Sequence, residues 1–248
     1  MATQLTVLGQ SVRWSERIGQ GATSSVWLSE SASTPCVLKL GKGPAEAPRF
    51  ADEAERLLFA AAPEFPALLA VGLAGPALGA ELGQRIEAGT PYLVLSSAPG
   101  KSLAELLSEQ ALSAAAREEL SLLVARDVGA ALSALHGSGA AHGDVKPANI
   151  IIAADQARLV DFGLSGAAEQ AEPSGGTAHY LSPEVFAHGD GDARARDLWA
   201  LGVTLLEILE PASASRQDRD FQVRDQGALA PVVRALLAPA PGARPSAS

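Results

Sequence analysis

The chain has 248 residues, of which 47% are hydrophobic, so it is long enough for one large domain or two joined lobes with a sizeable core. Its formal net charge of −9 argues against binding to nucleic acid or to anionic membranes. Cys36 is the one cysteine, which excludes an internal disulfide and indicates a cytoplasmic location. We expect neither a signal peptide nor a membrane segment, since no long uncharged apolar run occurs.

Short apolar or β-branched segments separated by Gly, Ser, Thr or Pro predict strands in the first part of the chain. These segments are Val12–Ile18, Val26–Glu30, Cys36–Leu40, Leu68–Gly72 and Tyr92–Leu95. Residues 45–61 have a helical apolar pattern. The stretch 73–89 is rich in glycine and has no pattern that can be assigned.

Helical patterns dominate after Leu95. Ser102 and Glu105 have the spacing of a capping box, which predicts the start of a helix. Apolar residues recurring over 120–135 predict a long buried helix that ends at Gly137 or Gly139, and those over 198–209 predict another. A short hairpin is expected over 150–160. Strands followed by helices indicate an α+β protein with a sheet lobe, 1–95, and a helical lobe, 96–248.

A glycine-rich hairpin and a lysine in an apolar strand are candidates for phosphate binding. Gly19 and Gly21 would let backbone N–H groups approach phosphates, although such a hairpin is also a common plain turn. Lys39 could extend to the surface or reach the α- and β-phosphates of a nucleotide. Glu53 is the preferred carboxylate partner for Lys39, and Glu55 on another helix face is the alternative.

The segment His142-Gly-Asp-Val-Lys-Pro-Ala-Asn149, followed by Asp161-Phe-Gly163, is the strongest chemical signal. Asp144 could accept a proton from a hydroxyl, and Lys146 could neutralise charge on a moving phosphoryl group. Asn149 and Asp161 offer the oxygen ligands that suit Mg²⁺. A polar loop with capping side chains is the alternative, which the order of the two motifs disfavours.

These motifs resemble those of eukaryotic-type (Hanks-type) serine/threonine protein kinase domains. Ser182-Pro-Glu184, Asp197-Leu-Trp199-Ala-Leu-Gly202 and Arg244-Pro245 continue the match. The resemblance implies a two-lobed fold, with an antiparallel sheet and one main helix in the N-lobe. It implies transfer of the γ-phosphate of ATP, with Mg²⁺, to a Ser or Thr hydroxyl of a protein substrate. It also implies that Asp197 supports the catalytic-loop backbone and that Glu184 pairs with Arg244.

The resemblance assigns further residues to the nucleotide site. Val26, Val37 and Ile151 would sandwich the adenine, Leu95 would be the gatekeeper, and backbone groups from Ser96 to Ala98 would hydrogen-bond the base. A plain core role is the alternative for the apolar residues.

Other residues would couple the lobes or the catalytic loop. A column of Leu57, His142 and Phe162 is implied between the lobes. Thr177 would hydrogen-bond Asp144 and Lys146, which is typical of Ser/Thr rather than Tyr kinases.

Two features depart from the family. Gly143 stands where most protein kinases have Arg, and His-Gly-Asp also occurs in small-molecule phosphotransferases of the aminoglycoside-kinase type. Such an enzyme and a pseudokinase are the alternative functions. Because Gly143 cannot bind a loop phosphate and residues 161–184 contain no Lys or Arg, we predict activity without loop phosphorylation. The family adds a helix after the position of Arg244, so we expect a C-lobe truncated at Ser248.

Overall fold

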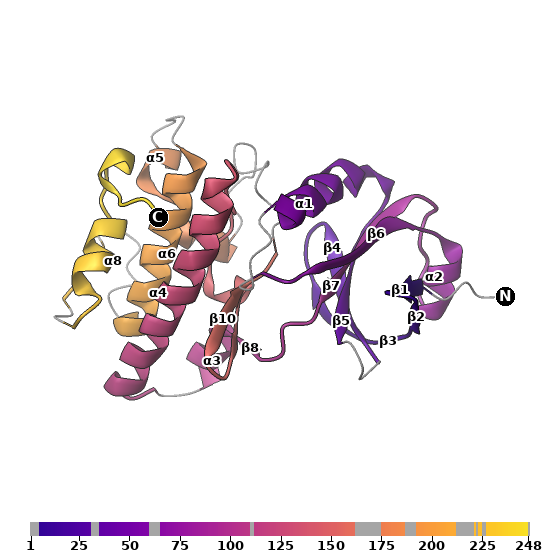
Figure 1. Cartoon of the computed structure of the whole chain (residues 1–248), viewed down its shortest axis with the longest axis horizontal. Helices are drawn as coiled ribbons and strands as arrows, with labels where there is room; N and C mark the ends of the chain where they lie inside the picture. Colours follow the sequence, from indigo (N-terminus) through magenta and orange to yellow (C-terminus); the bar gives the residue numbers. More distant parts are fainter. Residues whose placement is uncertain are drawn as a thin grey trace. The chain divides into compact units, whose positions relative to one another are not determined.

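The computed structural model describes residues 5–30, 35–59, 65–109, 112–161, 175–186, 192–211, 221, 223–224 and 227–247. The chain divides into two compact units, Met1–Ala98 and Pro99–Ser248. The first contains a five-stranded antiparallel sheet, and the described part of the second is mostly helical (Figure 1). This confirms the predicted two-lobed α+β fold; the lobe boundary at residue 95 stays a prediction.

The sheet of the first unit contains the strands that the apolar segments predicted. In spatial order they are β3 (Trp14–Gln20), β4 (Ser24–Ser29), β5 (Cys36–Gly41), β7 (Thr90–Ser96) and β6 (Leu68–Ala74). The strand predicted over 12–18 is divided, since β2 (Gln10–Val12) instead forms a hairpin with β1 (Leu5–Val7). The turn of this hairpin has positive φ at Leu8 and Gly9, which let the chain reverse.

One face of this sheet carries Lys39. Side chains alternate along a strand, so Lys39 on β5 points away from its neighbours Leu38 and Leu40. Helix α1 (Ala47–Phe59) follows the one-turn η1 (Pro44–Glu46), contacts β6 and β7, and carries the partner of Lys39. The predicted helix over 45–61 is confirmed as far as the structure describes it.

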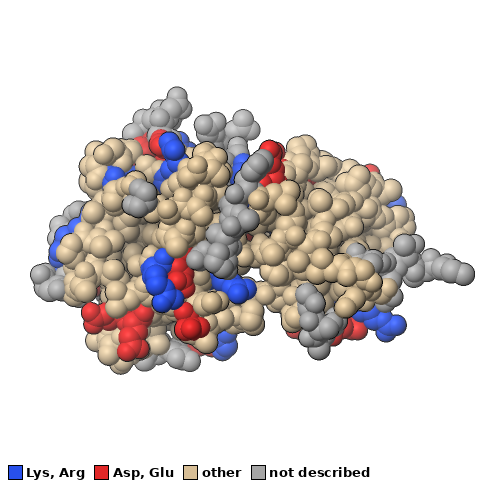
Figure 2. Space-filling view, in the orientation of Figure 1, with Lys and Arg blue, Asp and Glu red and all other residues tan. Residues whose placement is uncertain are grey.

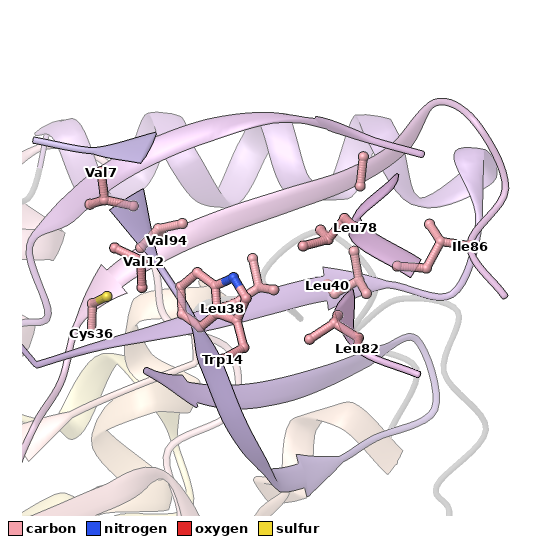
Figure 3. Close-up of a cluster of buried hydrophobic side chains, with 11 residues drawn as sticks. Val7, Val12, Trp14, Cys36, Leu38, Leu40, Leu78, Leu82, Ile86 and Val94 are labelled. Atoms are coloured by element: carbon pink, nitrogen blue, oxygen red, sulfur yellow. The ribbon is translucent and has the colours of Figure 1, made fainter. Parts of the chain in front are cut away.

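The opposite face of the sheet is covered by the β1–β2 hairpin and by α2 (Pro76–Glu81). Figure 3 shows Trp14, Leu38 and Leu40 meeting Leu78, Leu82 and Ile86, which come from α2 and its linker to β7. Leu38 and Leu40 are at most 1% exposed, and burial of each such side chain stabilises the fold by roughly 1.5–3 kcal/mol. The unassigned stretch 73–89 therefore completes the core.

The second unit is built on two buried helices that lie side by side, α4 (Ala114–Gly137) and α6 (Ala193–Leu209) (Figure 1). Val124, Val128, Leu132 and Leu135 are fully buried, as their spacing predicted. The smaller helices are α3 (Leu103–Glu109), α5 (Pro183–Phe186) and α8 (Ala230–Leu236), with one or two turns of 3₁₀ helix in η2 (Pro147–Asn149), η3 (Gly175–Tyr180) and η4 (Pro241–Ala243).

Local signals set the ends of elements in this unit. The capping box is confirmed, because the Ser102 N–H donates to Glu105 Oε2 at 2.8 Å and the Glu105 N–H donates to Ser102 Oγ at 3.2 Å. Strands β9 (Ile150–Ala153) and β10 (Gln156–Leu159) form the predicted hairpin, and β8 (Lys101–Ser102) pairs with β9. This hairpin carries the catalytic-loop segment at one end and Asp161 at the other.

The surface shown in Figure 2 carries acidic and basic side chains intermingled, without a continuous basic area among the coloured residues. None of the described helices has the length and hydropathy that crossing a membrane requires.

Candidate active site

Lys39 and Glu53 form a buried ion pair in the first unit. The Lys39 ammonium donates to both carboxylate oxygens of Glu53, at 2.8 and 2.7 Å, and the two side chains are 7% and 1% exposed. Glu55 is exposed on α1, so the structure selects Glu53 from the two alternatives. A buried charge is costly when it is unpaired, so Glu53 fixes the position of the Lys39 amine.

Two predicted adenine-contacting residues share the face of Lys39. Val26 on β4 lies opposite Lys39 in the sheet register, and Val37 precedes Lys39 by two positions on β5. Both valines remain partly exposed, whereas Leu95 on β7 is only 6% exposed. Gly19 lies opposite Val26, and the Gly21 N–H donates to Ser24 O at 2.8 Å, which closes the hairpin. This face therefore carries two apolar side chains, Val26 and Val37, next to the Lys39 ammonium that Glu53 positions.

Two of the three backbone amides over Ser96–Ala98 donate to backbone carbonyls. The Ser96 N–H donates to Ala67 O at 2.8 Å, and the Ser97 N–H donates to Pro35 O at 2.9 Å. The Ala98 N–H bonds to no described residue. Within the described part of the chain, Ala98 is thus the one of these three amides that donates to no backbone carbonyl.

Asp144, Lys146 and Asn149 meet in the second unit. Lys146 Nζ donates to the two Asp144 carboxylate oxygens at 2.9 and 2.7 Å, and Asn149 Nδ2 donates to Asp144 Oδ2 at 2.8 Å. The turn of η2 brings Asn149 back towards Asp144, since the Asn149 N–H donates to Lys146 O at 2.9 Å. Asp144 is 6% exposed, so its carboxylate has a defined position from which to orient a hydroxyl.

Asp197 on α6 holds the backbone of this loop. Its carboxylate accepts hydrogen bonds from the His142 and Gly143 N–H groups, both at 2.8 Å, and it is 1% exposed. Gly143 has φ +80°, a conformation that strains residues with a Cβ. Glycine at this position therefore suits the loop's own backbone.

A backbone hydrogen bond brings the chain next to Asp161 close to Asn149. The Val160 N–H donates to Asn149 O at 2.9 Å, which places Asp161 beside Asn149. The Asn149 amide oxygen accepts no hydrogen bond from the described residues. No described cluster holds three His, Cys, Asp or Glu side chains, as an all-protein cage would need. An amide oxygen and a carboxylate fit Mg²⁺, which commonly completes its shell with phosphates and water.

His142 interacts electrostatically with the acidic residues of this unit's candidate site. It is fully buried, and burial lowers the pKa of its imidazole, although the carboxylates of Asp197, Asp144 and Asp161 oppose this shift. Full burial of His142 agrees with a structural position. Its implied neighbour Phe162 lies outside the described residues, as does Gly163. Leu57 is buried in the first unit, and Ile151 is partly exposed in the second.

Glu184 and Arg244 form the bidentate pair that the resemblance implied. Arg244 Nη1 and Nη2 donate to the two Glu184 oxygens at 2.7 and 2.8 Å. Arg244 also donates to three backbone carbonyls and lies with its guanidinium carbon 5.0 Å from the centroid of the Trp199 ring. The pair connects α5, which carries Glu184, to the segment after η4, which carries Arg244.

The structure adds two contacts that the sequence did not indicate. His136 Nε2 lies 2.9 Å from Asp197 Oδ2, and the Tyr180 hydroxyl donates to Glu207 Oε2 at 2.7 Å. Burial raises the pKa of Tyr180, and Glu207 raises it further. His136 and Asp197 are 61 positions apart, and Tyr180 and Glu207 are 27 positions apart. No local sequence pattern could therefore reveal either contact. The side chain of Thr177 lies outside the described part of the chain.

Comparison with known proteins gives two overlapping family matches. The sequence model described as protein kinase domain matches residues 85–237, and that of the phosphotransferase enzyme family matches residues 14–141. The first match contains Asp144, Asn149, Asp161 and Glu184. The second ends at Ala141, before the catalytic-loop segment.

Several similar proteins are named serine/threonine-protein kinases. PknE of Mycobacterium tuberculosis is 38% identical over 127 residues, which cover 49% of this chain and 22% of PknE. PknL of the same species is 38% identical over 125 residues, covering 48% of this chain and 30% of PknL. AtPK1/AtPK6 of Arabidopsis thaliana is 37% identical over 122 residues, covering 48% and 25%. The chain thus matches less than a third of the length of these relatives.

The region matched by the kinase model extends from the linker before β7 to the end of α8 and includes the loop that Asp197 supports. More than half of the chain lies within it. On this match and the geometry of the loop, the chain belongs to the protein kinase domain family.

Proposed function

We propose that the chain transfers the γ-phosphate of ATP to a Ser or Thr hydroxyl of a protein substrate. The observation that carries this proposal is the Asp144 carboxylate, which accepts hydrogen bonds from Lys146 and Asn149 in a loop held by Asp197. Asp144 orients the hydroxyl and takes its proton, and Lys146 stabilises negative charge on the moving phosphoryl group. Thr177 is the proposed additional partner of Asp144 and Lys146.

The remaining polar residues bind the nucleotide. Lys39, positioned by Glu53, neutralises the α- and β-phosphates, and the glycine-rich hairpin of Gly19 and Gly21 lies over the phosphates. Asn149 and Asp161 would hold Mg²⁺, which supplies charge neutralisation at the phosphates when bound. The proposed adenine contacts are apolar ones from Val26, Val37, Leu95 and Ile151, with the Ser96 carbonyl and the Ala98 N–H as hydrogen-bonding groups.

MgATP is expected to raise the melting temperature of the protein, because a ligand that binds only the folded state stabilises it. Lys39→Met and Asp161→Ala should both reduce the shift, since each removes a proposed phosphate or metal contact. Lys101→Met is the matched control, because Lys101 is exposed and pairs only with exposed Glu109 among the described residues. Differential scanning fluorimetry measures all four proteins. A wild-type protein without a shift at millimolar MgATP would contradict the nucleotide site.

A small-molecule phosphotransferase is the second candidate, favoured by the family match over residues 14–141. The two functions differ in the acceptor. Transfer of radiolabel to a generic protein supports the first, and transfer to an aminoglycoside or another alcohol in a panel supports the second. A pseudokinase is disfavoured because Lys39, Asp144, Asn149 and Asp161 are all present.

We also predict that activity does not require phosphorylation of the 161–184 loop. Gly143 has no side chain that a loop phosphate could neutralise. An arginine elsewhere, such as Arg49 on α1, is the alternative partner for that phosphate, but Arg49 Nη1 already lies 3.8 Å from Glu46 Oε2. Phosphatase-treated enzyme and a Ser165→Ala/Ser174→Ala variant should keep their initial rates. Thr177 stays intact in that variant because its proposed role is structural. A tenfold or larger fall after either treatment would disprove the prediction.

The cellular compartment is a further proposal. Cys36 is a free, buried thiol, and burial raises its pKa, which disfavours the reactive thiolate form. A chain without another cysteine suits the reducing cytoplasm.

A further inference from the structure

A small cavity on the first unit is lined by three cations. Arg17 comes from β3, Lys42 follows β5, and Arg85 lies in the linker between α2 and β7. The volume is about 130 Å³, well below the roughly 300–1,000 Å³ of typical small-molecule sites. A cavity of this size suits one small polar group rather than a nucleotide.

The sheet register places this cavity on the face opposite Lys39. Arg17 lies across from Trp27, which lies across from Leu38, and Gln20 lies across from Ser25, which lies across from Leu40. Leu38 and Leu40 belong to the buried cluster on that opposite face. The cavity is therefore separate from the proposed nucleotide face.

An irregularity in β3 brings the polar residues together. Residues three apart in a regular strand point to opposite faces, but the register shifts between Arg17 and Gly19. The extra residue lets both Arg17 and Gln20 line the cavity.

The linker that carries Arg85 is anchored firmly. Ile86 is 6% exposed and lies beside Leu40 and Leu82 in the core shown in Figure 3. The Gln84 N–H donates to Gly79 O at 2.9 Å, and Thr90 Oγ1 donates to Glu87 O at 2.8 Å. The backbone of Arg85 is thus fixed on one side by the hydrogen bond of Gln84 and on the other by the buried side chain of Ile86.

Charge in the cavity is unbalanced. No acidic side chain is among its lining residues, and Arg17, Lys42 and Arg85 make no ion pair within the described part of the chain. Elsewhere Arg126, Arg194 and Arg244 each pair with a carboxylate. Glu46, the acid that is close to Lys42 in sequence, lies near Arg49 instead. Three cations with Gln and Ser donors form a concentrated positive site on a chain of net charge −9.

We propose that this cavity, lined by Arg17, Lys42 and Arg85, binds a phosphate group. Arg guanidinium groups bind phosphate oxygens through two parallel hydrogen bonds, and Lys adds a point charge. Gln20, Gln84 and Ser25 supply neutral polar groups around the same space. The group can be inorganic phosphate or the phosphate of a phosphorylated Ser in a peptide, and binding at this site does not require the proposed kinase activity.

The test titrates the nucleotide-free protein with inorganic phosphate, up to about 20 mM, and with a phosphoserine peptide beside its unphosphorylated copy. Binding is followed by calorimetry at two salt concentrations. Arg17→Gln and Arg85→Gln should each weaken phosphate binding at least about tenfold. Arg13→Gln is the control, because it makes the same change of charge outside the cavity. Arg13 does not line the cavity and lies four residues before Arg17, which is about 13 Å along a strand. All three arginines are exposed, so the variants should keep the wild-type melting temperature.

Saturable binding of both ligands that is lost in Arg17→Gln and Arg85→Gln supports a general phosphate site. Binding of the phosphopeptide alone, with the same loss, supports the site and identifies its ligand as a peptide phosphate. The proposal is overturned by absence of saturable binding of either ligand, or by binding that Arg13→Gln weakens as much as the cavity variants do.

Discussion

Asp144→Asn is expected to lower the rate of phosphoryl transfer at least about a hundredfold, while the affinity for MgATP changes little. The carboxylate of Asp144 is the proposed proton acceptor, and an amide of the same shape lacks its charge. Lys146 can still reach the remaining oxygen, because it now bonds to both at 2.9 and 2.7 Å. Single-turnover transfer and calorimetric titration with MgATP separate chemistry from binding.

Asp155→Asn is the matched control for this experiment. This substitution removes one negative charge from the same unit, as Asp144→Asn does. Asp155, however, is exposed in the turn between β9 and β10. Its transfer rate should equal that of the wild type. Full activity of Asp144→Asn, or a loss explained entirely by weaker MgATP binding, would show that the assigned role is wrong.

Arg244→Met is expected to lower the free energy of unfolding by about 3–5 kcal/mol, because it leaves a partly buried carboxylate without its partner. The side chain of Arg244 is 0% exposed and that of Glu184 is 10% exposed. The variant also removes the donors for the carbonyls of Ala195, Ala238 and Pro239. Urea unfolding followed by circular dichroism measures the change.

The pH dependence of stability supplies a second readout of this pair. Burial alone would raise the pKa of Glu184, but the hydrogen bonds from Arg244, from the backbone and from Ser182, together with the charge of Arg244, outweigh that effect and lower it. A carboxyl with a depressed folded-state pKa contributes stability that is complete above its unfolded-state pKa. That contribution disappears as the pH falls through the folded-state value. Arg244→Met should therefore lose less stability than the wild type on acidification through this range.

Arg194→Met is the control for Arg244→Met, because Arg194 also pairs with a carboxylate but both side chains are 49% exposed. Solvent screens such a pair, so the change in stability should be barely measurable. Equal destabilisation by the two variants would contradict the importance assigned to the buried pair.

Periodic elements of this protein could be predicted from local sequence. The long helix α4 follows from apolar residues at helical spacing, and α3 follows from the Ser102–Glu105 capping box, because both signals act within a few residues. Helix α2 had no such signal. It is six residues long, and its stability comes from burial of Leu78 against the sheet.

Motif order by itself identified the family and predicted the candidate site residues, because Lys39, Asp144, Asn149 and Asp161 stand at recognisable spacings. Only the tertiary structure decided which partners they meet. Glu53 and Glu55 are both plausible in sequence, and burial of Glu53 beside Lys39 selects between them. The contacts of Asp197 with His142, and of Glu184 with Arg244, join residues 55 and 60 positions apart. Such contacts depend on how separate elements pack, since hydrogen bonds between distant segments leave no periodic trace in the sequence.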